Sequence, residues 1–166
     1  MKIWRLLLRL VVGVLFVGHG TQKLFGWFDG HGLDATADGF DQMGLKPGKA
    51  NAIAAGVGEA GGGALLAVGL LTPLAAANIT ATMLMAIYRV HLKNGPWITK
   101  GGYEYNLVLI LAALALVEAG PGALSLDAAM GRELKGAGWA LAAAAAGALG
   151  AAGANFAAGP APEPQG

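Results

Sequence analysis

The segment "VGHGTQKLFGWFDG", residues 17–30, closes a long apolar run and carries His19 and Lys23 four positions apart. Positions i and i+4 of a helix lie on one face, so these two ionisable side chains are predicted neighbours. The apolar run extends from about Leu6 to Phe25, close to the roughly 20 residues that cross a bilayer core. The segment therefore predicts a membrane-spanning helix that brings ionisable side chains into the bilayer.

The composition of the chain is typical of a membrane protein. Of its 166 residues, 55% are apolar (AVILMFWYC) and 13% are charged (DEKR), whereas a soluble domain has about 25% charged residues. The net charge of +1, without a basic patch or nucleic-acid motif, indicates no nucleic-acid partner. The chain has no cysteine, so any redox chemistry in it needs a bound cofactor or a partner protein.

Three further apolar runs follow, at about Ala50 to Leu71, Leu74 to Val90 and Tyr105 to Ala119. Thr72 and Pro73 form a very short link, which forces the second and third runs to be antiparallel neighbours. Helices satisfy their own backbone hydrogen bonds, as a bilayer requires. The predicted fold class is therefore all-α, an integral membrane bundle of four transmembrane helices joined by polar connections at 29–49 and 91–104.

The C-terminal part has a different composition. Residues Ala137 to Ala158 are nearly all alanine and glycine. Their length fits a fifth span, and their weak hydrophobicity fits a surface helix equally well. The final "GPAPEPQG" is typical of a disordered tail. We therefore expect a four-helix membrane domain at residues 1–131, an Ala/Gly-rich helix at 132–158 and a disordered tail at 159–166.

Basic residues near the N-terminus favour one orientation. Lys2, Arg5 and Arg9 precede and overlap the first apolar run, and such a cluster usually stays in the cytoplasm. We therefore expect a multi-pass protein with a cytoplasmic N-terminus, which places His19 in the outer half of the bilayer. The cytoplasmic end then receives only the Thr72–Pro73 turn and the two chain termini.

Antiparallel spans bring scattered polar side chains to one end of the bundle. His19 lies roughly 9 Å inside the end of the first helix, and Glu59 roughly 13 Å inside the start of the second. Glu59 is the natural counter-ion of Lys23, because an unpaired charge in a bilayer costs several kcal/mol. His19, Lys23 and Glu59 are the candidate catalytic residues. The alternatives are a structural Lys23–Glu59 ion pair, a core histidine, and a lysine that extends to the interface.

Five other residues are candidates for holding a cofactor: Gln22, Trp27, His91, Trp97 and Glu104. Three of them offer hydrogen-bonding groups at the same end as Lys23, and either tryptophan could stack on a flat ring. The alternatives are that His91 only marks the interface and that the tryptophans form an interfacial aromatic belt. The three histidines show no metal-site spacing, so no metal site is predicted.

Five blocks of the chain carry a family resemblance: "GHGTQKLFGWF" (18–28), "GEAGGGALLAVGLLTPLAA" (58–76), "MLMAIYRVHLKNGPW" (83–97), "GGYEYNLVLI" (101–110) and "GPGALSLD" (120–127). In these blocks the chain resembles the DoxX family of small bacterial membrane proteins. The resemblance implies a four-helix protein of the bacterial inner (plasma) membrane. It also implies a subunit of a thiosulfate:quinone oxidoreductase, or a partner of a sulfurtransferase and a superoxide dismutase in oxidative-stress assemblies.

Two functions of different classes follow. The first is a quinone-linked membrane oxidoreductase component, in which His19 or Lys23 donates to a quinone carbonyl and Glu59 relays protons. Its electrons would come from a substrate or a soluble redox partner protein. The second is a non-catalytic membrane anchor whose loops, 29–49 and 91–104, recruit soluble redox enzymes. A transporter fits less well, because polar residues at one end alone provide no path across the bilayer.

Overall fold

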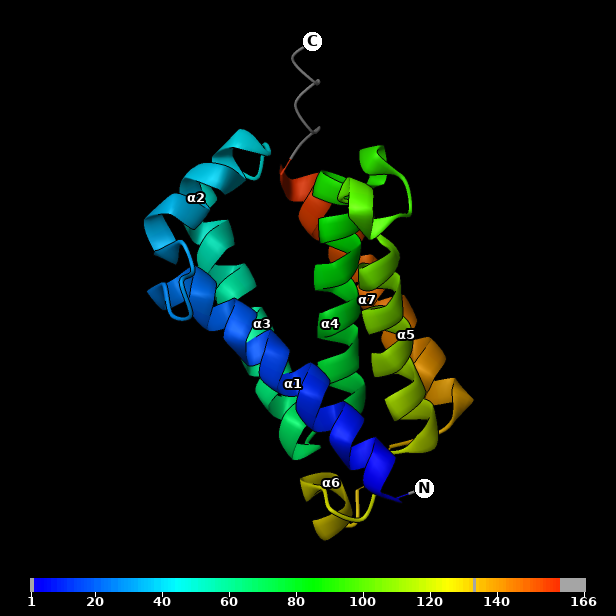
Figure 1. The fold of residues 1–166 in the computed structure, drawn as a ribbon. Coiled ribbons are helices and arrows are strands. Elements are labelled where there is room, and N and C mark those ends of the chain that lie inside the picture. The colour runs from blue at the N-terminus through cyan, green and yellow to red at the C-terminus, as the bar shows by residue number, and fades with distance from the viewer. Residues whose placement is uncertain (1, 133, 159–166) are drawn as a thin grey trace.

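The computed structural model describes residues 2–132 and 134–158, and these residues form helices without any strand. The predicted tail at 159–166 lies outside the described residues. Figure 1 shows the helices, which are α1 (Lys2–Phe25), α2 (Gly32–Gln42), α3 (Gly48–Val68), α4 (Thr72–Ala86), η1 (Ile87–His91), η2 (Leu92–Asn94), η3 (Ile98–Lys100), α5 (Glu104–Ala119), α6 (Leu126–Ala129) and α7 (Ala137–Ala158).

Three helices are long and apolar enough to cross a membrane: Ile3–Phe25 of α1, Gly48–Val68 of α3, and Ala137–Ala158, which is α7. The all-α class is therefore confirmed, whereas a bundle of four spanning helices is not. The third and fourth apolar runs form α4 and α5, which have 15 and 16 residues and are shorter than a full crossing. α4 nevertheless continues without a break through η1 and η2 to Asn94.

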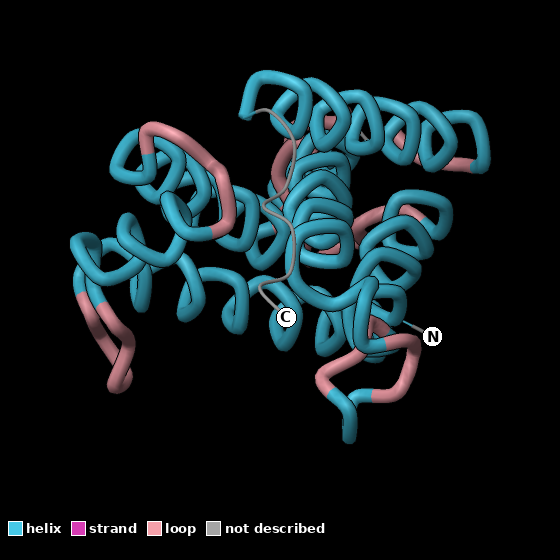
Figure 2. Tube along the Cα trace, turned by 90° about the horizontal axis from the view of Figure 1, so that it is seen from above, coloured by secondary structure: helices cyan, strands magenta, loops and turns pink. Residues whose placement is uncertain are grey.

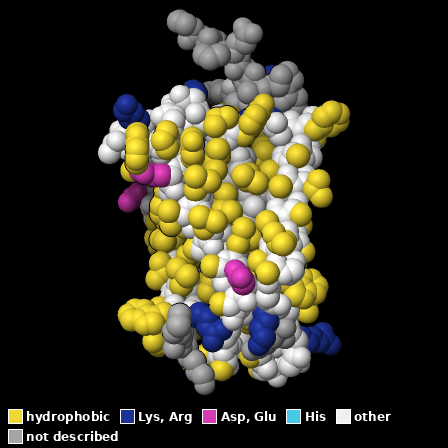
Figure 3. Space-filling model, turned by 90° about the vertical axis from the view of Figure 1, so that its right-hand side faces the viewer, with side chains coloured by type: hydrophobic (Ala, Val, Ile, Leu, Met, Phe, Trp, Pro, Cys, Tyr) yellow, Lys and Arg dark blue, Asp and Glu magenta, His cyan; other side chains and the backbone are white. Residues whose placement is uncertain are grey.

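The surface of the protein is apolar along the middle of the helices. Figure 3 shows one such face, with hydrophobic side chains over its middle and Lys and Arg side chains at its two ends. Large hydrophobic side chains on several helices are exposed, among them Val11, Val14, Leu74, Val108, Leu111, Leu141 and Leu149. An exposed apolar area of this extent marks a surface that contacts lipid or another protein.

Glycines allow α1 and α3 to pack at backbone distance. A Cβ atom added to Gly20 would lie 2.5 Å from the backbone nitrogen of Ala60 on α3. One added to Gly63 would lie 2.5 Å from the carbonyl oxygen of Gly13 on α1. Membrane helices use small residues in this way, because close backbone approach supplies van der Waals contact that lipid cannot displace.

A second group of helices contains α4, α5 and α7. Gly147 of α7 sits against Thr80 and the backbone of Ala77 on α4, which is why no larger side chain fits there. The Ala/Gly-rich segment is therefore a packed helix that covers α4 and α5. The two groups diverge toward the end that carries α2, and Figure 2 views the molecule from that end.

The predicted polar connection at 29–49 contains a helix, α2, and the expectation of a solvated loop there is wrong for Gly32–Gln42. Ala37 is buried, whereas Asp34 and Asp38 face outward. The Asp41 carboxylate accepts a hydrogen bond of 2.9 Å from the backbone N–H of Gly48, which joins the end of α2 to the start of α3.

The end of the molecule that carries the N-terminus holds a second polar cluster, contrary to the expectation of a bare turn and two termini. Arg9 is 2% exposed, and its guanidinium donates to the carbonyl oxygens of Ala67, Pro121 and Leu124. The planar fork of arginine can reach three carbonyls at once. Arg9 therefore fastens the segment after α5 to α1 and α3.

Asp127 completes this cluster from α6. Its carboxylate accepts hydrogen bonds from the backbone N–H groups of Leu71 (2.9 Å) and Thr72 (3.0 Å) and from the Thr72 hydroxyl (2.8 Å). These N–H groups begin α4 and have no partner within the helix, so the carboxylate satisfies them.

The start of α1 and the last turn of α7 lie at opposite ends of the molecule, because α7 runs back to the end that carries α2 (Figure 1).

Candidate functional site

A cavity of about 500 Å³ lies between the two helix groups. Its wall comes from α1, α3, α4, α5 and α7, and the segment around α2 contributes Phe40, Met43 and Leu45. Most of the lining is apolar, with a few polar side chains among the apolar ones. A volume of roughly 300–1,000 Å³ and such a lining are typical of small-molecule sites.

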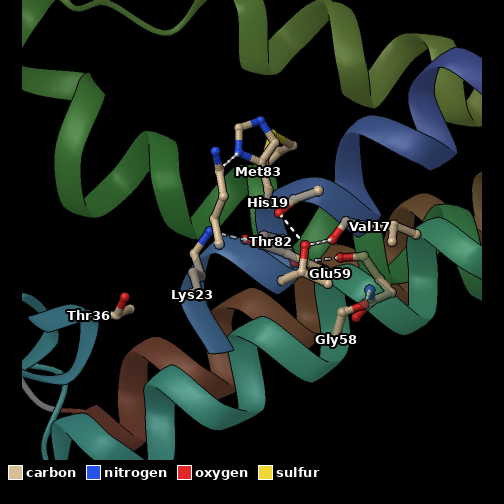
Figure 4. Close-up of polar contacts among 12 residues, drawn as sticks. Val17, His19, Lys23, Thr36, Gly58, Glu59, Thr82 and Met83 are labelled. Carbon is tan, nitrogen blue, oxygen red and sulfur yellow. Dashed lines mark hydrogen bonds and ion pairs between the residues drawn. The ribbon is translucent and has the colours of Figure 1, made fainter. Parts of the chain in front are cut away.

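Lys23 and Glu59 form an ion pair in this cavity wall, as the sequence predicted for a counter-ion. The Lys23 Nζ atom lies 2.6 Å from Oε2 of Glu59, and their side chains are 26% and 5% exposed. Figure 4 shows both residues beside His19, on the facing helices α1 and α3. The Gly56, Gly62 and Gly63 positions around Glu59 are buried, so α1 and α4 approach its helix closely.

His19 lines the same cavity one helical turn from Lys23. Its Nδ1 atom lies 3.1 Å from Oε1 of Gln22, so the tautomer protonated at Nδ1 donates to that amide. Gln22 in turn donates to the carbonyl oxygen of Phe28 over 3.3 Å and does not line the cavity. Gln22 is thus placed to orient His19 rather than to touch a ligand.

His91 lines the cavity, whereas Glu104 organises the neighbouring loop. The Nδ1 atom of His91 lies 2.8 Å from the carbonyl oxygen of Gly101. Glu104 accepts a 2.7 Å hydrogen bond from the backbone N–H of Ile98 and lies outside the lining. The loop between α4 and α5 is therefore held by its own polar groups.

The two candidate tryptophans do not reach the cavity. Trp27 is 57% exposed and contacts Phe25 and Phe28, with ring centroids 5.4 and 6.4 Å apart. Trp97 is 60% exposed and also lies outside the lining. Their positions match those of an interfacial aromatic belt. The aromatic side chains that do line the cavity are Phe16, Phe40 and Tyr105.

Sequence reasoning missed the methionines and amides of the lining. Met43, Met83 and Met85 contribute flexible thioethers, which adapt to ligands of different shape. The Asn106 amide donates to the sulfur of Met83 over 3.3 Å. The sequence feature that could have indicated these lining residues is the block "MLMAIYRVH", in which methionines and basic residues occur together at the end of an apolar run.

Arg89 comes from a π-helical turn, η1 (Ile87–His91), in which one extra residue widens the helix. Its guanidinium donates to the carbonyl oxygens of Met43 (3.1 Å) and Asn155 (3.3 Å). Met43 follows α2 and Asn155 belongs to the last turn of α7, so one side chain joins two segments far apart in sequence. Such turns recur at functional sites, and here Arg89, Val90 and His91 all line the cavity.

The arrangement can bind a small, mostly apolar molecule and exchange protons with it. Lys23 offers N–H donors, His19 offers the lone pair of Nε2, and Glu59 offers a carboxylate shielded from water. Within residues 2–132 and 134–158, no group of three His, Asp or Glu side chains is placed to hold a metal ion.

Comparisons with known proteins agree with the resemblance in the sequence. The sequence model of the DoxX family matches residues 4–92. The chain is 33% identical over 126 residues to "Putative oxidoreductase CatD" of Bacillus subtilis (strain 168), which covers 76% of this chain and 86% of that protein. It is 35% identical over 63 residues to an uncharacterized protein of Haemophilus influenzae, which covers 38% of this chain and 42% of that protein. No solved structure matches the chain significantly.

Proposed function

The chain belongs to the DoxX family, and on that premise we propose that it is a membrane subunit of a redox system whose cavity binds a quinone. The observation that carries this proposal is the Lys23–Glu59 pair, 2.6 Å apart with a buried carboxylate, in the wall of a mostly apolar cavity. Ionisable groups within a membrane bundle face its interior and mark functional sites by default.

The lining fits a quinone in size and chemistry. The cavity holds about 500 Å³, and its apolar atoms suit a ring while Lys23 and Tyr105 offer donors for carbonyl oxygens. A bound quinone supplies the ability to take up two electrons together with two protons. Glu59 is placed to exchange a proton with Lys23, because it lies within hydrogen-bonding distance of Lys23 and away from water.

The membrane placement is part of the proposal. α1, α3 and α7 cross the bilayer of the bacterial plasma membrane, and α4 with its η1–η2 extension and α5 lie in it beside them. α5 is about 24 Å long at about 1.5 Å per residue, a shortfall that local thinning of the bilayer absorbs. The N-terminus is cytoplasmic, so the cavity lies toward the outer half of the membrane.

Quinone binding by the purified protein tests the proposal. A benzoquinone without an isoprenoid tail is titrated calorimetrically into the protein in lipid nanodiscs. Lys23→Met weakens binding at least about tenfold, since it removes a hydrogen-bond donor worth about 1.5 kcal/mol or more. Glu59→Gln also weakens binding, because it removes the charge that holds the Lys23 ammonium in place. Glu118→Gln is the matched control, because Glu118 is exposed on α5 and outside the cavity lining. No binding by the wild type, or equal binding by all variants, contradicts the proposal.

The donor of the electrons is a separate question. Thiosulfate is the donor that the family resemblance suggests, and Arg89 and Lys23 are the cations of the lining that could attract an anion. Reduction of the quinone is therefore measured with and without thiosulfate, in the wild type and in Lys100→Met. Lys100 is an exposed cation on η3 and lies outside the cavity lining. If thiosulfate binds in the cavity, the loss of Lys100 leaves the rate of quinone reduction unchanged.

A membrane anchor for soluble enzymes is the second candidate function. The observation that favours it is α2, whose Asp34 and Asp38 side chains face outward at one end of the molecule. Such an acidic surface suits a basic soluble partner. Under this function Asp34→Lys with Asp38→Lys abolishes co-purification of the partner, whereas His19→Ala leaves co-purification unchanged.

A further inference from the structure

Arg5 on α1 has a fixed direction and no carboxylate partner among the described residues. Its Nη1 atom donates to the carbonyl oxygen of Ala119, the last residue of α5, over 2.5 Å and lies 3.4 Å from that of Gly120. Both partners are neutral, and no ion pair within residues 2–132 and 134–158 includes Arg5. A charge at the edge of a membrane span costs free energy unless it is hydrated or paired, so this guanidinium is suited to an anionic partner.

Arg9, one helical turn further along α1, is bonded differently. Its Nε, Nη1 and Nη2 atoms each donate to a backbone carbonyl, and the residue is 2% exposed. In Arg5, Nη1 is the atom that donates to the described chain, and the N–H groups on Nε and Nη2 have no acceptor there. These two groups form one edge of the guanidinium, which can bind two oxygens of a phosphate side by side.

A small hydrophobic recess lies beside this guanidinium. It holds about 180 Å³, and its lining contains apolar residues of α1 and of the segment after α5: Ile3, Leu6, Pro121, Gly122, Ala123 and Leu124. A Cβ atom added to Gly122 would lie 4.0 Å from both Cζ and Nε of Arg5, which places the guanidinium at the edge of the recess. A cation next to an apolar recess matches an anionic group attached to a hydrocarbon chain.

The recess lies near the membrane surface. The apolar span of α1 begins at Ile3, so Arg5 belongs to its first turn. Trp4 on α1 and Trp139 in the first turn of α7 are 69% and 44% exposed at the same end of the molecule (Figure 1). Exposed tryptophans gather at the membrane–water interface, where the phosphates of phospholipids also lie.

The other charged side chains at this end favour an anionic lipid over a neutral one. A Cβ atom added to Gly120 would lie 2.9 Å from Cδ of Lys135, so Lys135 and Arg5 approach the same residue. Arg132 and Lys135 are exposed, and Glu118 is the exposed acidic side chain among the described residues of this end. Figure 3 shows Lys and Arg side chains together at the lower end of the molecule. Such a surface attracts lipids with a net negative charge.

We propose that Arg5 and this recess bind an anionic phospholipid. The lipid phosphate accepts hydrogen bonds from Nε and Nη2 of Arg5, and an acyl chain lies against Leu6 and Leu124 in the recess. The phosphate then supplies the counter-charge for Arg5, as Glu59 does for Lys23. The recess shares no lining residue with the 500 Å³ cavity, so this lipid site does not depend on the proposed function.

Lipid binding by the intact protein in a neutral detergent tests the proposal. Dioctanoyl phosphatidylglycerol and dioctanoyl phosphatidylcholine are titrated separately, and the bound lipid is measured by native mass spectrometry. Arg5→Gln is expected to weaken phosphatidylglycerol binding at least about tenfold, because it removes charge-assisted hydrogen bonds. Arg132→Gln is the matched control, an exposed cation outside the recess, and weakens binding by less than about threefold. The wild type is expected to bind phosphatidylcholine at least about tenfold more weakly than phosphatidylglycerol.

A second variant tests the recess without removing a charge. Ala123→Phe fills the recess from an exposed position and is expected to weaken phosphatidylglycerol binding, so it decides the question if Arg5→Gln does not fold. Glycerol 3-phosphate carries the phosphate without acyl chains and is expected not to bind. Unchanged phosphatidylglycerol binding in either variant, or equal losses in Arg5→Gln and Arg132→Gln, overturns the proposal. It is also overturned if the wild type binds both lipids equally or binds glycerol 3-phosphate as tightly as phosphatidylglycerol.

Discussion

The Nζ atom of Lys23 on α1 and the Oε2 atom of Glu59 on α3 lie 2.6 Å apart although 36 positions separate them in the sequence. The contact holds the two most closely packed helices together at the cavity wall. The lysine keeps partial contact with the cavity space, whereas the carboxylate is almost fully covered. Removal of one partner and removal of both therefore have different consequences.

Lys23→Met is expected to lower the free energy of unfolding in detergent by about 3 kcal/mol, because it leaves the Glu59 carboxylate buried without a counter-charge. Lys23→Met combined with Glu59→Gln recovers part of this loss, since no uncompensated charge remains. Lys49→Met is the control: it removes the Lys49–Asp34 pair, which is 3.3 Å long and largely exposed, and changes stability by less than about 1 kcal/mol. Equal losses in the single and double variants would contradict the role of Lys23 as counter-ion.

Gly20→Ala is expected to destabilise the protein by about 1–3 kcal/mol, because its Cβ atom would lie 2.5 Å from backbone atoms of α3. Gly18→Ala, two residues earlier on α1, places its Cβ atom where nothing lies within 4 Å. This second substitution leaves stability unchanged or raises it by up to about 1 kcal/mol through better helix propensity. Thermal unfolding of both variants in the same detergent measures the difference. Equal unfolding temperatures of the Gly20→Ala and Gly18→Ala variants would contradict the close packing of α1 on α3.

Arg9→Lys is expected to lower the free energy of unfolding by about 2 kcal/mol. An ammonium group cannot reproduce the three hydrogen bonds from the guanidinium to Ala67, Pro121 and Leu124, so buried carbonyl groups lose their donors. Arg132→Lys is the control, because Arg132 lies at the same end of the molecule but is exposed to solvent. The prediction fails if Arg9→Lys is as stable as Arg132→Lys in denaturant titrations.

The orientation in the membrane can be measured by labelling single cysteines, since the chain has none of its own. Thr99→Cys lies on η3 at the α2 end, and Ala123→Cys lies after α5 at the other end; both positions are exposed. With a cytoplasmic N-terminus, a membrane-impermeant maleimide added to intact cells labels position 99 and spares position 123. Labelling of position 123 alone would reverse the proposed orientation.

The long apolar helices were predictable because their signal is local. α7 has the bounds expected from the Ala/Gly-rich run, and α5 begins one residue before the expected start. α2 was hidden because Asp34, Asp38, Asp41 and its glycines resemble a loop. Its helical signal lies in the spacing of Leu33, Ala37 and Phe40, which share one face. The helix forms because tertiary contacts favour it over weak local propensity.

The site was predictable only where charge was conspicuous within an apolar run. Glu59 and Lys23 stood out for that reason, and the structure places them in contact. Arg9 was interpreted as part of an N-terminal basic cluster, because its partners are carbonyl oxygens more than 50 positions away and carbonyls leave no trace in a sequence. The tryptophans were considered for a stacking role because aromatic rings suit ligands and interfaces alike, and only position in space distinguishes the two.

The direction in which the His91 ring points depends on the π-helical turn at Ile87–His91. Removing any one residue from that turn would restore the ordinary helical count and swing every later side chain by about 100° around the axis. The imidazole would then face elsewhere although none of its own atoms had been altered. The direction of the His91 side chain therefore depends on how many residues precede it in the turn, and not on which residues they are. Inserting or deleting one residue there is expected to change the cavity lining at His91 more than most point substitutions do.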